Sequence, residues 1–159
     1  MNIKIICVGK LKEKYLLDGI NEYSKRISKY SNIEIIELVD EPIPDNPSQK
    51  EVENIKKKEA DKIQNHIDSH DFVCSLDLSG KQLTSEEFAS KIIEITVQGF
   101  STIDFIIGGS LGIDKELVAN SNLILSFSKL TFPHQLFRMI LLEQIFRAYK
   151  INNNETYHK

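Results

Sequence analysis

The amino-acid sequence predicts an α/β fold, a mainly parallel sheet with helices on both faces, in a single domain of residues 1–159. Three observations support this fold class. Short apolar runs rich in β-branched residues alternate with segments whose apolar residues recur at helical spacing. Strands that alternate with helices pair in parallel, and a parallel sheet is covered on both faces. The chain contains no repeat and no interdomain linker, and its length suits one domain with its own core.

The first part of the chain predicts strand, helix, strand and loop. Residues 3–8 form an apolar run broken only by one lysine, and Gly9 ends it. In residues 12–30 apolar side chains recur at steps of three and four, as in an amphipathic helix. Residues 33–39 alternate and are β-branched, which predicts a second strand. Three of the four prolines fall in residues 40–48, which we therefore expect to be a loop.

The middle of the chain predicts two helices around a strand. Residues 49–70 are heavily charged and carry a thin apolar stripe, which indicates a solvated helix. Residues 72–78 are the third predicted strand. Thr84 and Glu87 match a capping box, in which each side chain bonds the backbone N–H of the other residue. A helix is expected from there to about Gln98.

The remaining elements before the last loop are short. Residues 103–107 predict the fourth strand, and the turn Gly108-Gly-Ser-Leu-Gly112 follows it. A short helix is expected over 114–119, and a fifth strand over 122–125. The glycine turn has neither the spacing of a dinucleotide fingerprint nor the Gly-Lys-Ser/Thr of a phosphate-binding P-loop. A close backbone approach to a flat ligand and a plain strand-to-helix turn both remain open.

The last stretch predicts a polar loop, residues 126–131, and a long apolar helix. Pro133 suits a helix start, and the helix is expected to run to about Lys150. Of the fourteen residues 136–149, ten are apolar or aromatic, too many for one core-facing stripe. The helix therefore needs cover on more than one side, and we expect part of that cover from a second subunit.

Composition narrows the class of function. The chain is 41% hydrophobic and 27% charged, as in ordinary globular proteins, and no apolar run is long enough to span a bilayer. We therefore expect a cytoplasmic protein that does not bind a membrane. Cys7 and Cys74 lie in apolar runs without a Cys-x-x-Cys pattern, which argues against a disulfide, a zinc site and thiol catalysis. His66 and His70 lack further ligands nearby, so no metal is expected.

The charge is unevenly distributed along the chain. The net charge of −3 argues against non-specific coating of nucleic acid. From residue 126 onward, five Lys or Arg stand against two Glu, so the end of the chain is basic on an acidic body. This pattern weakly favours a local anionic partner such as an RNA phosphate.

Three strand ends are candidates for one binding site. In parallel sheets ligands bind beyond the carboxyl ends of the strands. Here those ends carry residues 76–80, the glycine turn 108–112 and the loop 127–132. The last loop combines hydroxyl groups, backbone and two phenylalanines, a combination suited to holding a nucleoside.

Two pairs of residues in the last helix are four apart and so share a face. For His134 and Arg138, at the helix start, a binding site and a capping histidine with a solvated arginine are both open interpretations. The N-terminus of a helix favours an anionic or electron-rich ligand. Glu143 and Arg147 fit a surface ion pair that contributes roughly 0.3–0.5 kcal/mol.

Several motifs together resemble the RlmH (YbeA-like) family, pseudouridine methyltransferases of the large-subunit ribosomal RNA in the SPOUT class. The resemblance covers the whole chain. The motifs are Phe105-Ile-Ile-Gly-Gly-Ser-Leu-Gly112, Ser128-Lys-Leu-Thr-Phe-Pro-His-Gln-Leu-Phe-Arg138, Leu142-Glu-Gln-Ile-Phe-Arg-Ala148 and the ending Tyr157-His-Lys159.

The resemblance implies a C-terminal trefoil knot, a homodimer, and S-adenosyl-L-methionine as cofactor. The implied substrate is N3 of a pseudouridine in 23S rRNA of the assembled ribosome. The cofactor contacts implied by motif are Leu76, Gly108, Phe127, Ser128, Lys129, Leu130, Thr131 and Phe132.

Methylation of an imide nitrogen needs an aligned methyl donor and removal of the N3 proton. We hypothesise that His134 positions or deprotonates the base, with the tail histidine His158 or bulk water as alternative bases, and that Arg138 stabilises the oxyanion of the base or binds a phosphate. Tyr157 and His158 are expected to complete the RNA pocket. Two rival functions remain compatible with the sequence: a non-catalytic ribosome-binding factor and a small nucleotide-binding regulator.

Overall fold

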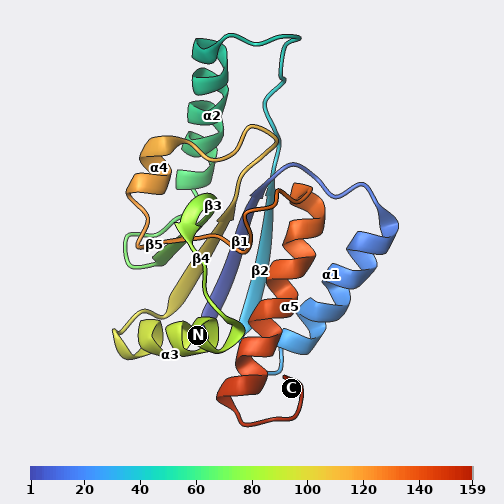
Figure 1. Ribbon diagram of the computed structural model, residues 1–159, viewed down its shortest axis with the longest axis vertical. Coiled ribbons are helices and arrows are strands. Elements are labelled where there is room, and N and C mark those ends of the chain that lie inside the picture. The colour runs from blue at the N-terminus through green and yellow to red at the C-terminus, as the bar shows by residue number, and fades with distance from the viewer. Residues whose placement is uncertain (159) are drawn as a thin grey trace.

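The computed structural model describes residues 1–158 and shows an α/β fold with a five-stranded parallel sheet (Figure 1). The elements are β1 (Asn2–Val8), α1 (Lys14–Ile27), β2 (Asn32–Leu38), α2 (Gln49–Gln64), β3 (Phe72–Lys81), α3 (Ser85–Val97), β4 (Thr102–Ile107), α4 (Lys115–Ala119), β5 (Leu123–Leu125) and α5 (His134–Asn152). The strand order in the sheet is β2-β1-β4-β3-β5. The predicted fold class is confirmed.

Helices cover both faces of the sheet because the central strands are apolar on both sides. On β1, Ile3, Ile5 and Cys7 belong to the core formed with α1, α3 and α5. Ile6 and Val8 point the other way and pack with α2 and α4. Successive side chains of a strand alternate between faces, so one apolar run supplies two cores.

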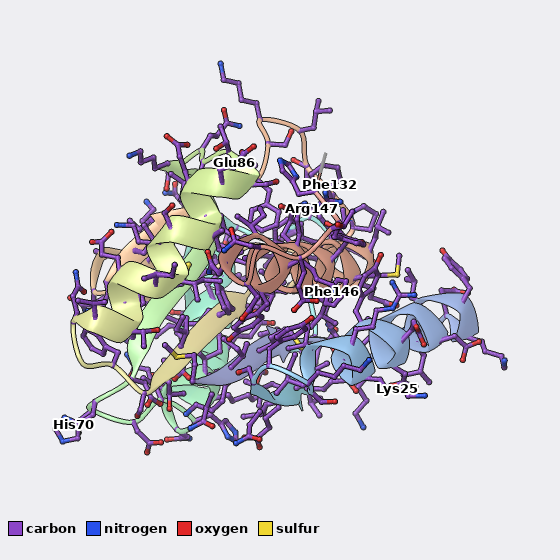
Figure 2. All side chains as sticks on the ribbon, turned by 90° about the horizontal axis from the view of Figure 1, so that it is seen from below. Lys25, His70, Glu86, Phe132, Phe146 and Arg147 are labelled. Atoms are coloured by element: carbon purple, nitrogen blue, oxygen red, sulfur yellow. The ribbon has the colours of Figure 1, made fainter. Side chains whose placement is uncertain are left out.

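The helix α5 lies between α1 and α3 (Figure 2). Its most buried positions include Leu141, Leu142 and Ile145, none of which has a measurably exposed surface. The two flanking helices of the same chain therefore cover much of the apolar surface of α5, an arrangement that helical periodicity alone does not predict. Among residues 1–158, no helix, α5 included, is both long and apolar enough to cross a membrane.

Two boundaries differ from the prediction for identifiable reasons. The helix expected over 49–70 ends at Gln64, and the chain then turns, with the N–H of Asp68 donating to Asp71 Oδ2 at 3.2 Å. The strand β3 continues to Lys81, which pairs with Leu125 of β5 after an irregularity in the register. The predicted capping box of α3 is confirmed.

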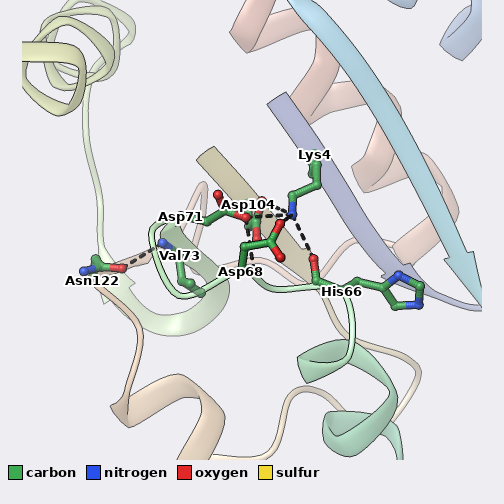
Figure 3. A network of polar contacts seen from close by, with 7 residues as sticks. All are labelled: Lys4, His66, Asp68, Asp71, Val73, Asp104 and Asn122. Carbon is green, nitrogen blue, oxygen red and sulfur yellow. Dashed lines mark hydrogen bonds and ion pairs between the residues drawn. The ribbon is translucent and has the colours of Figure 1, made fainter. Parts of the chain in front are cut away.

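An ion-pair cluster joins the amino-terminal halves of β1 and β4 (Figure 3). Lys4 Nζ lies 2.7 Å from Asp71 Oδ2 and 3.4 Å from Asp104 Oδ1, and it also donates to the carbonyl oxygen of His66 at 2.8 Å. Asp104 is completely buried. Burial, together with the neighbouring Asp71 carboxylate, raises the pKa of Asp104 to about 7.

Candidate functional site

A cavity of about 740 Å³ lies at the carboxyl ends of β3, β4 and β5. Its walls come from residues 76–78, 107–113, 125–128 and 130–134, with further contributions from Lys56 and Phe137. The three strand ends singled out in the sequence therefore meet at one cavity, as expected for a parallel sheet.

Glycines allow the backbone to fold tightly around this cavity. A Cβ atom on Gly108 would lie 2.7 Å from the carbonyl carbon of Gly112, and Gly112 itself has a φ of +88°. A Cβ atom on Gly80 would lie 2.6 Å from the backbone of Leu125. No larger residue fits at Gly80 or Gly108 without displacing backbone, so glycine there keeps β3, β5 and the glycine turn in close contact.

Seven of the eight predicted cofactor residues line the cavity. They are Leu76, Gly108, Phe127, Ser128, Leu130, Thr131 and Phe132. Lys129, the eighth, lies in the same loop but is exposed and does not contribute to the lining. The loop is held by its own polar groups, since Ser126 Oγ donates to the Ser128 carbonyl and the Leu130 N–H donates to Ser128 Oγ, both at 3.0 Å.

Aromatic rings support the loop from behind. The ring of Phe137 on α5 packs against Phe127 at 5.1 Å between centroids and stacks on Phe132 at 6.1 Å. Two charged side chains of opposite sign, Lys56 and Asp77, also line the cavity. The site therefore offers apolar walls together with a few charged groups, the usual composition of a small-molecule pocket.

His134 lines the cavity at the first residue of α5. Its Nε2 would lie 3.1 Å from a Cβ atom on Gly9, so the imidazole rests against the backbone of that glycine. Burial lowers the pKa of His134, and the nearby positive charge of Arg138 lowers it further. The ring is therefore neutral at physiological pH and able to accept a proton.

Arg138 does not line the cavity, although it stands one helical turn from His134. Its side chain is fully buried. Its Nη1 donates to Glu37 Oε2 at 2.7 Å, and its Nη2 donates to the carbonyl oxygen of Gly9 at 3.1 Å. The interpretation as a solvated arginine is wrong, because a carboxylate 101 positions earlier in the chain draws the guanidinium inward. The structure also gives no support to direct contact between Arg138 and a ligand in the cavity.

The predicted substrate residue Tyr157 packs at the far end of α5. Its ring lies edge-on to Phe146 at 4.9 Å, and the guanidinium of Arg147 lies 4.8 Å from the ring centroid. The Tyr157 hydroxyl donates to Glu143 Oε1 at 3.1 Å. Burial is the main cause that raises the pKa of Tyr157 to about 12, so its hydroxyl stays protonated.

His158 joins the same group of residues. Its Nδ1 lies 3.2 Å from Arg147 Nη1, and its Nε2 lies 2.7 Å from Glu86 Oε1 at the start of α3. Arg147 follows His134 by 13 positions, about 20 Å along the axis at 1.5 Å per residue. Within one chain the tail and His134 are therefore separated. Lys159, which completes the Tyr157-His-Lys159 motif, lies outside the described residues.

Three residues of this arrangement were missed or underrated in the sequence. Glu37 carried no local signal, because its partner Arg138 is distant in sequence. Arg147 does pair with Glu143 as expected, but it also holds the tail, and only the whole network shows this. Lys56 was assigned to a solvated helix and instead reaches the cavity.

Residues 1–158 give no support to a metal site or to thiol catalysis. They contain no group of three or more His, Cys, Asp or Glu side chains placed to hold a metal ion. Cys7 and Cys74 are both free and buried, and burial raises the pKa of the Cys7 thiol to about 11. A thiol of this kind is a poor nucleophile.

Comparisons with known proteins agree with this geometry. A family model described as "Predicted SPOUT methyltransferase" matches residues 1–158. The "Ribosomal RNA large subunit methyltransferase H" of Clostridium beijerinckii is 59% identical over 159 residues, which is 100% of both chains. The protein of the same name from Clostridium novyi is 57% identical, again over 100% of both chains. Among solved structures, "a probable methylase family protein" from Haemophilus influenzae Rd KW20 has a TM-score of 0.54 at 12% identity, covers 99% of this chain and 70% of that chain, and shows the fold alone.

Proposed function

Since the chain belongs to the SPOUT methyltransferase family, within the group named ribosomal RNA large subunit methyltransferase H, we propose that it methylates a pseudouridine in 23S rRNA of the assembled ribosome. The methyl donor is S-adenosyl-L-methionine, the acceptor is ring nitrogen N3, and the reaction takes place in the cytoplasm. The observation that carries this proposal is the meeting of three strand ends at one cavity, beside a neutral histidine.

The residues of the cavity fit this cofactor. A volume of about 740 Å³ suits a ligand of that size. The glycine turn brings backbone to the wall, and Phe127 and Phe132 supply apolar surface for a nucleoside. Lys56 and Asp77 match, by charge, the carboxylate and the ammonium of an amino acid group. When bound, the cofactor supplies an electrophilic methyl group on a sulfonium.

His134 acts on the acceptor base in this proposal. An imide nitrogen must lose its proton to become a nucleophile. The neutral imidazole of His134 would take the N3 proton and so leave N3 as a nucleophile. Because its pKa is lowered, His134 releases the proton again readily at physiological pH.

We further propose that the protein acts as a homodimer in which the tail of one protomer serves the cavity of its partner. The separation of about 20 Å between His134 and Arg147, on which the tail packs, supports this arrangement. Tyr157 and His158 would then contact the RNA base beside the partner's cavity. The close passage of β5 against β3 at Gly80 is compatible with the expected trefoil knot, which remains a prediction.

Two measurements test the activity. Isothermal calorimetry with S-adenosylhomocysteine should show binding, which neither rival function predicts. Mass spectrometry of 23S rRNA from a strain lacking the gene should show one methyl group added to a pseudouridine by the purified protein. His134→Ala should abolish the transfer and keep binding, whereas His70→Ala, at an exposed position, should change neither.

A mixed dimer tests the sharing of the tail. One chain carries His134→Ala with an intact tail, and the other keeps His134 but lacks residues 156–159. If the tail acts across the dimer, the mixture regains activity that neither chain has alone. No recovery in a dimer shown to be mixed would place the tail and His134 of one chain in the same site.

A further inference from the structure

The carboxylate of Glu37 joins two parts of the chain that flank the cavity. Its Oε2 accepts from Arg138 Nη1 at 2.7 Å and from the Leu11 N–H at 2.8 Å. Arg138 in turn donates to the carbonyl oxygen of Gly9 at 3.1 Å. One ion pair thus connects α5 to the end of β2 and to the loop of residues 9–12 between β1 and α1.

Stabilisation of the fold alone does not explain this ion pair, because its arginine is fully buried while the carboxylate of Glu37 is 36% exposed. Removing a guanidinium from water is costly, and apolar residues of similar size often replace buried ion pairs at no loss of stability. The Nε of Arg138 also has no hydrogen-bond partner within residues 1–158. The presence of the ion pair is therefore better explained by the way it holds α5, β2 and the loop of residues 9–12 together than by a gain in stability.

The loop held by this pair supports His134 directly. Gly9 has a φ of +96°, and a Cβ atom there would come within 3.1 Å of His134 Nε2. The Lys12 N–H donates to Gln135 Oε1 at 3.2 Å. The N-cap residue Pro133 offers no side-chain hydrogen bond to α5, so the start of this helix depends on contacts from outside it.

We propose that Glu37 is a positioning residue, which acts through Arg138 and the loop of residues 9–12 to fix the imidazole of His134 at the wall of the cavity. This inference rests on the proposed function for its effect on methyl transfer. The effect on the histidine itself does not depend on that function.

The variant Glu37→Gln tests the proposal, with Glu34→Gln as matched control. Both are exposed residues of β2, but it is Glu37 that pairs with Arg138. Glutamine keeps an acceptor for Leu11 and loses the charge that neutralises Arg138. We expect kcat to fall at least tenfold in Glu37→Gln, with the Kd for S-adenosylhomocysteine within twofold of wild type. Glu34→Gln should match the wild type in both.

A titration of His134 by NMR separates positioning from folding. The charged groups that act on its ring are Arg138, from its own helix, and Asp40, from the loop after β2. Without Glu37 the charge of Arg138 is no longer balanced, so the pKa of His134 should fall further in Glu37→Gln. The titration should be unchanged in the control.

Two results would overturn the proposal. One is an unchanged titration of His134 in a folded Glu37→Gln variant. The other is full activity in the double variant Glu37→Gln/Arg138→Met, because an uncharged pair would then replace the ion pair without loss of positioning. If the wild type neither binds S-adenosylhomocysteine nor methylates RNA, the proposed function fails, while the titration still decides the role of Glu37.

Discussion

Replacing Asp104 with asparagine should remove a pH dependence of stability that is built into the centre of the sheet. Asp104 is completely buried beside Lys4 and Asp71, and its pKa in the folded chain is about 7. In the unfolded chain its pKa returns to the ordinary 3.8. The folded state thus binds this proton more tightly than the unfolded state. The resulting stabilisation is complete below pH 3.8 and is lost as the pH rises towards 7.

The magnitude follows from the difference between the two pKa values. One pKa unit corresponds to about 1.4 kcal/mol, so a difference of about three units gives an upper limit of about 4 kcal/mol. Asp71, whose pKa is lowered, changes its contribution mainly below pH 3.8 and so outside this window. His134 has a lowered pKa and an effect of opposite sign, which cancels when variant and wild type are compared. Between pH 4.5 and pH 7.5 we expect the free energy of unfolding of Asp104→Asn to rise by about 2–4 kcal/mol relative to that of the wild type.

Urea denaturation followed by circular dichroism at four values of pH between 4.5 and 7.5 measures this gain. Asp61→Asn, at an exposed position of α2, is the control and should follow the wild type. If the free energy of unfolding changed with pH in the same way in Asp104→Asn and in the wild type, the reasoning would be refuted, because Asp104 would then not change its protonation in this range.

Four other substitutions or truncations have defined outcomes. Gly80→Ala should destabilise the fold strongly, since the new methyl group would lie 2.6 Å from the backbone of Leu125, and a fall in the thermal midpoint of less than a few degrees would contradict this. Arg138→Ala should cost about 1–3 kcal/mol in urea denaturation, because it removes a fully buried side chain and its hydrogen bonds to Glu37 and to the Gly9 carbonyl oxygen, whereas the carboxylate left behind is 36% exposed; a surface role predicts under 1 kcal/mol. Removal of residues 156–159 should leave a chain that binds S-adenosylhomocysteine but does not methylate ribosomes; retained methylation would exclude a substrate role for the tail. Thr84→Ala should cost about 1 kcal/mol through loss of the capping box, while Thr84→Ser should be near neutral by the same assay.

Local patterns were sufficient to predict the elements and the place of the cavity. The capping box at Thr84 and the alternation of strands and helices are features of neighbouring residues, and both are found in the structure. The cavity was predictable because parallel strands bring their carboxyl ends to one edge of the sheet. The prediction ran past Gln64 at the end of α2, where Lys4 of β1 donates to the carbonyl oxygen of His66 from 62 positions away, a contact that no local pattern reports.

The contacts between distant residues were not predictable in this way. Arg138 and Glu37 are 101 positions apart, and His158 and Glu86 are 72 apart. Helical spacing placed His134 and Arg138 on one face, but it does not show which way a long side chain turns. The position of Glu37, the ion-pair partner of Arg138, decides that direction, and no periodicity in the sequence reports it.

Because the chain is synthesised from its N-terminus, the cavity forms only after its last walls have been made. The first four strands and the first three long helices come from residues 2–107, yet the cavity walls 125–134 and the helix α5 come from the last part of the chain. A nascent chain that has not yet released α5 leaves the face of Ile3, Ile5 and Phe105 without part of its cover, because only α1 and α3 then pack on it. Binding competence therefore arises only once α5 has been made, and premature termination anywhere before α5 yields a product that exposes part of its core.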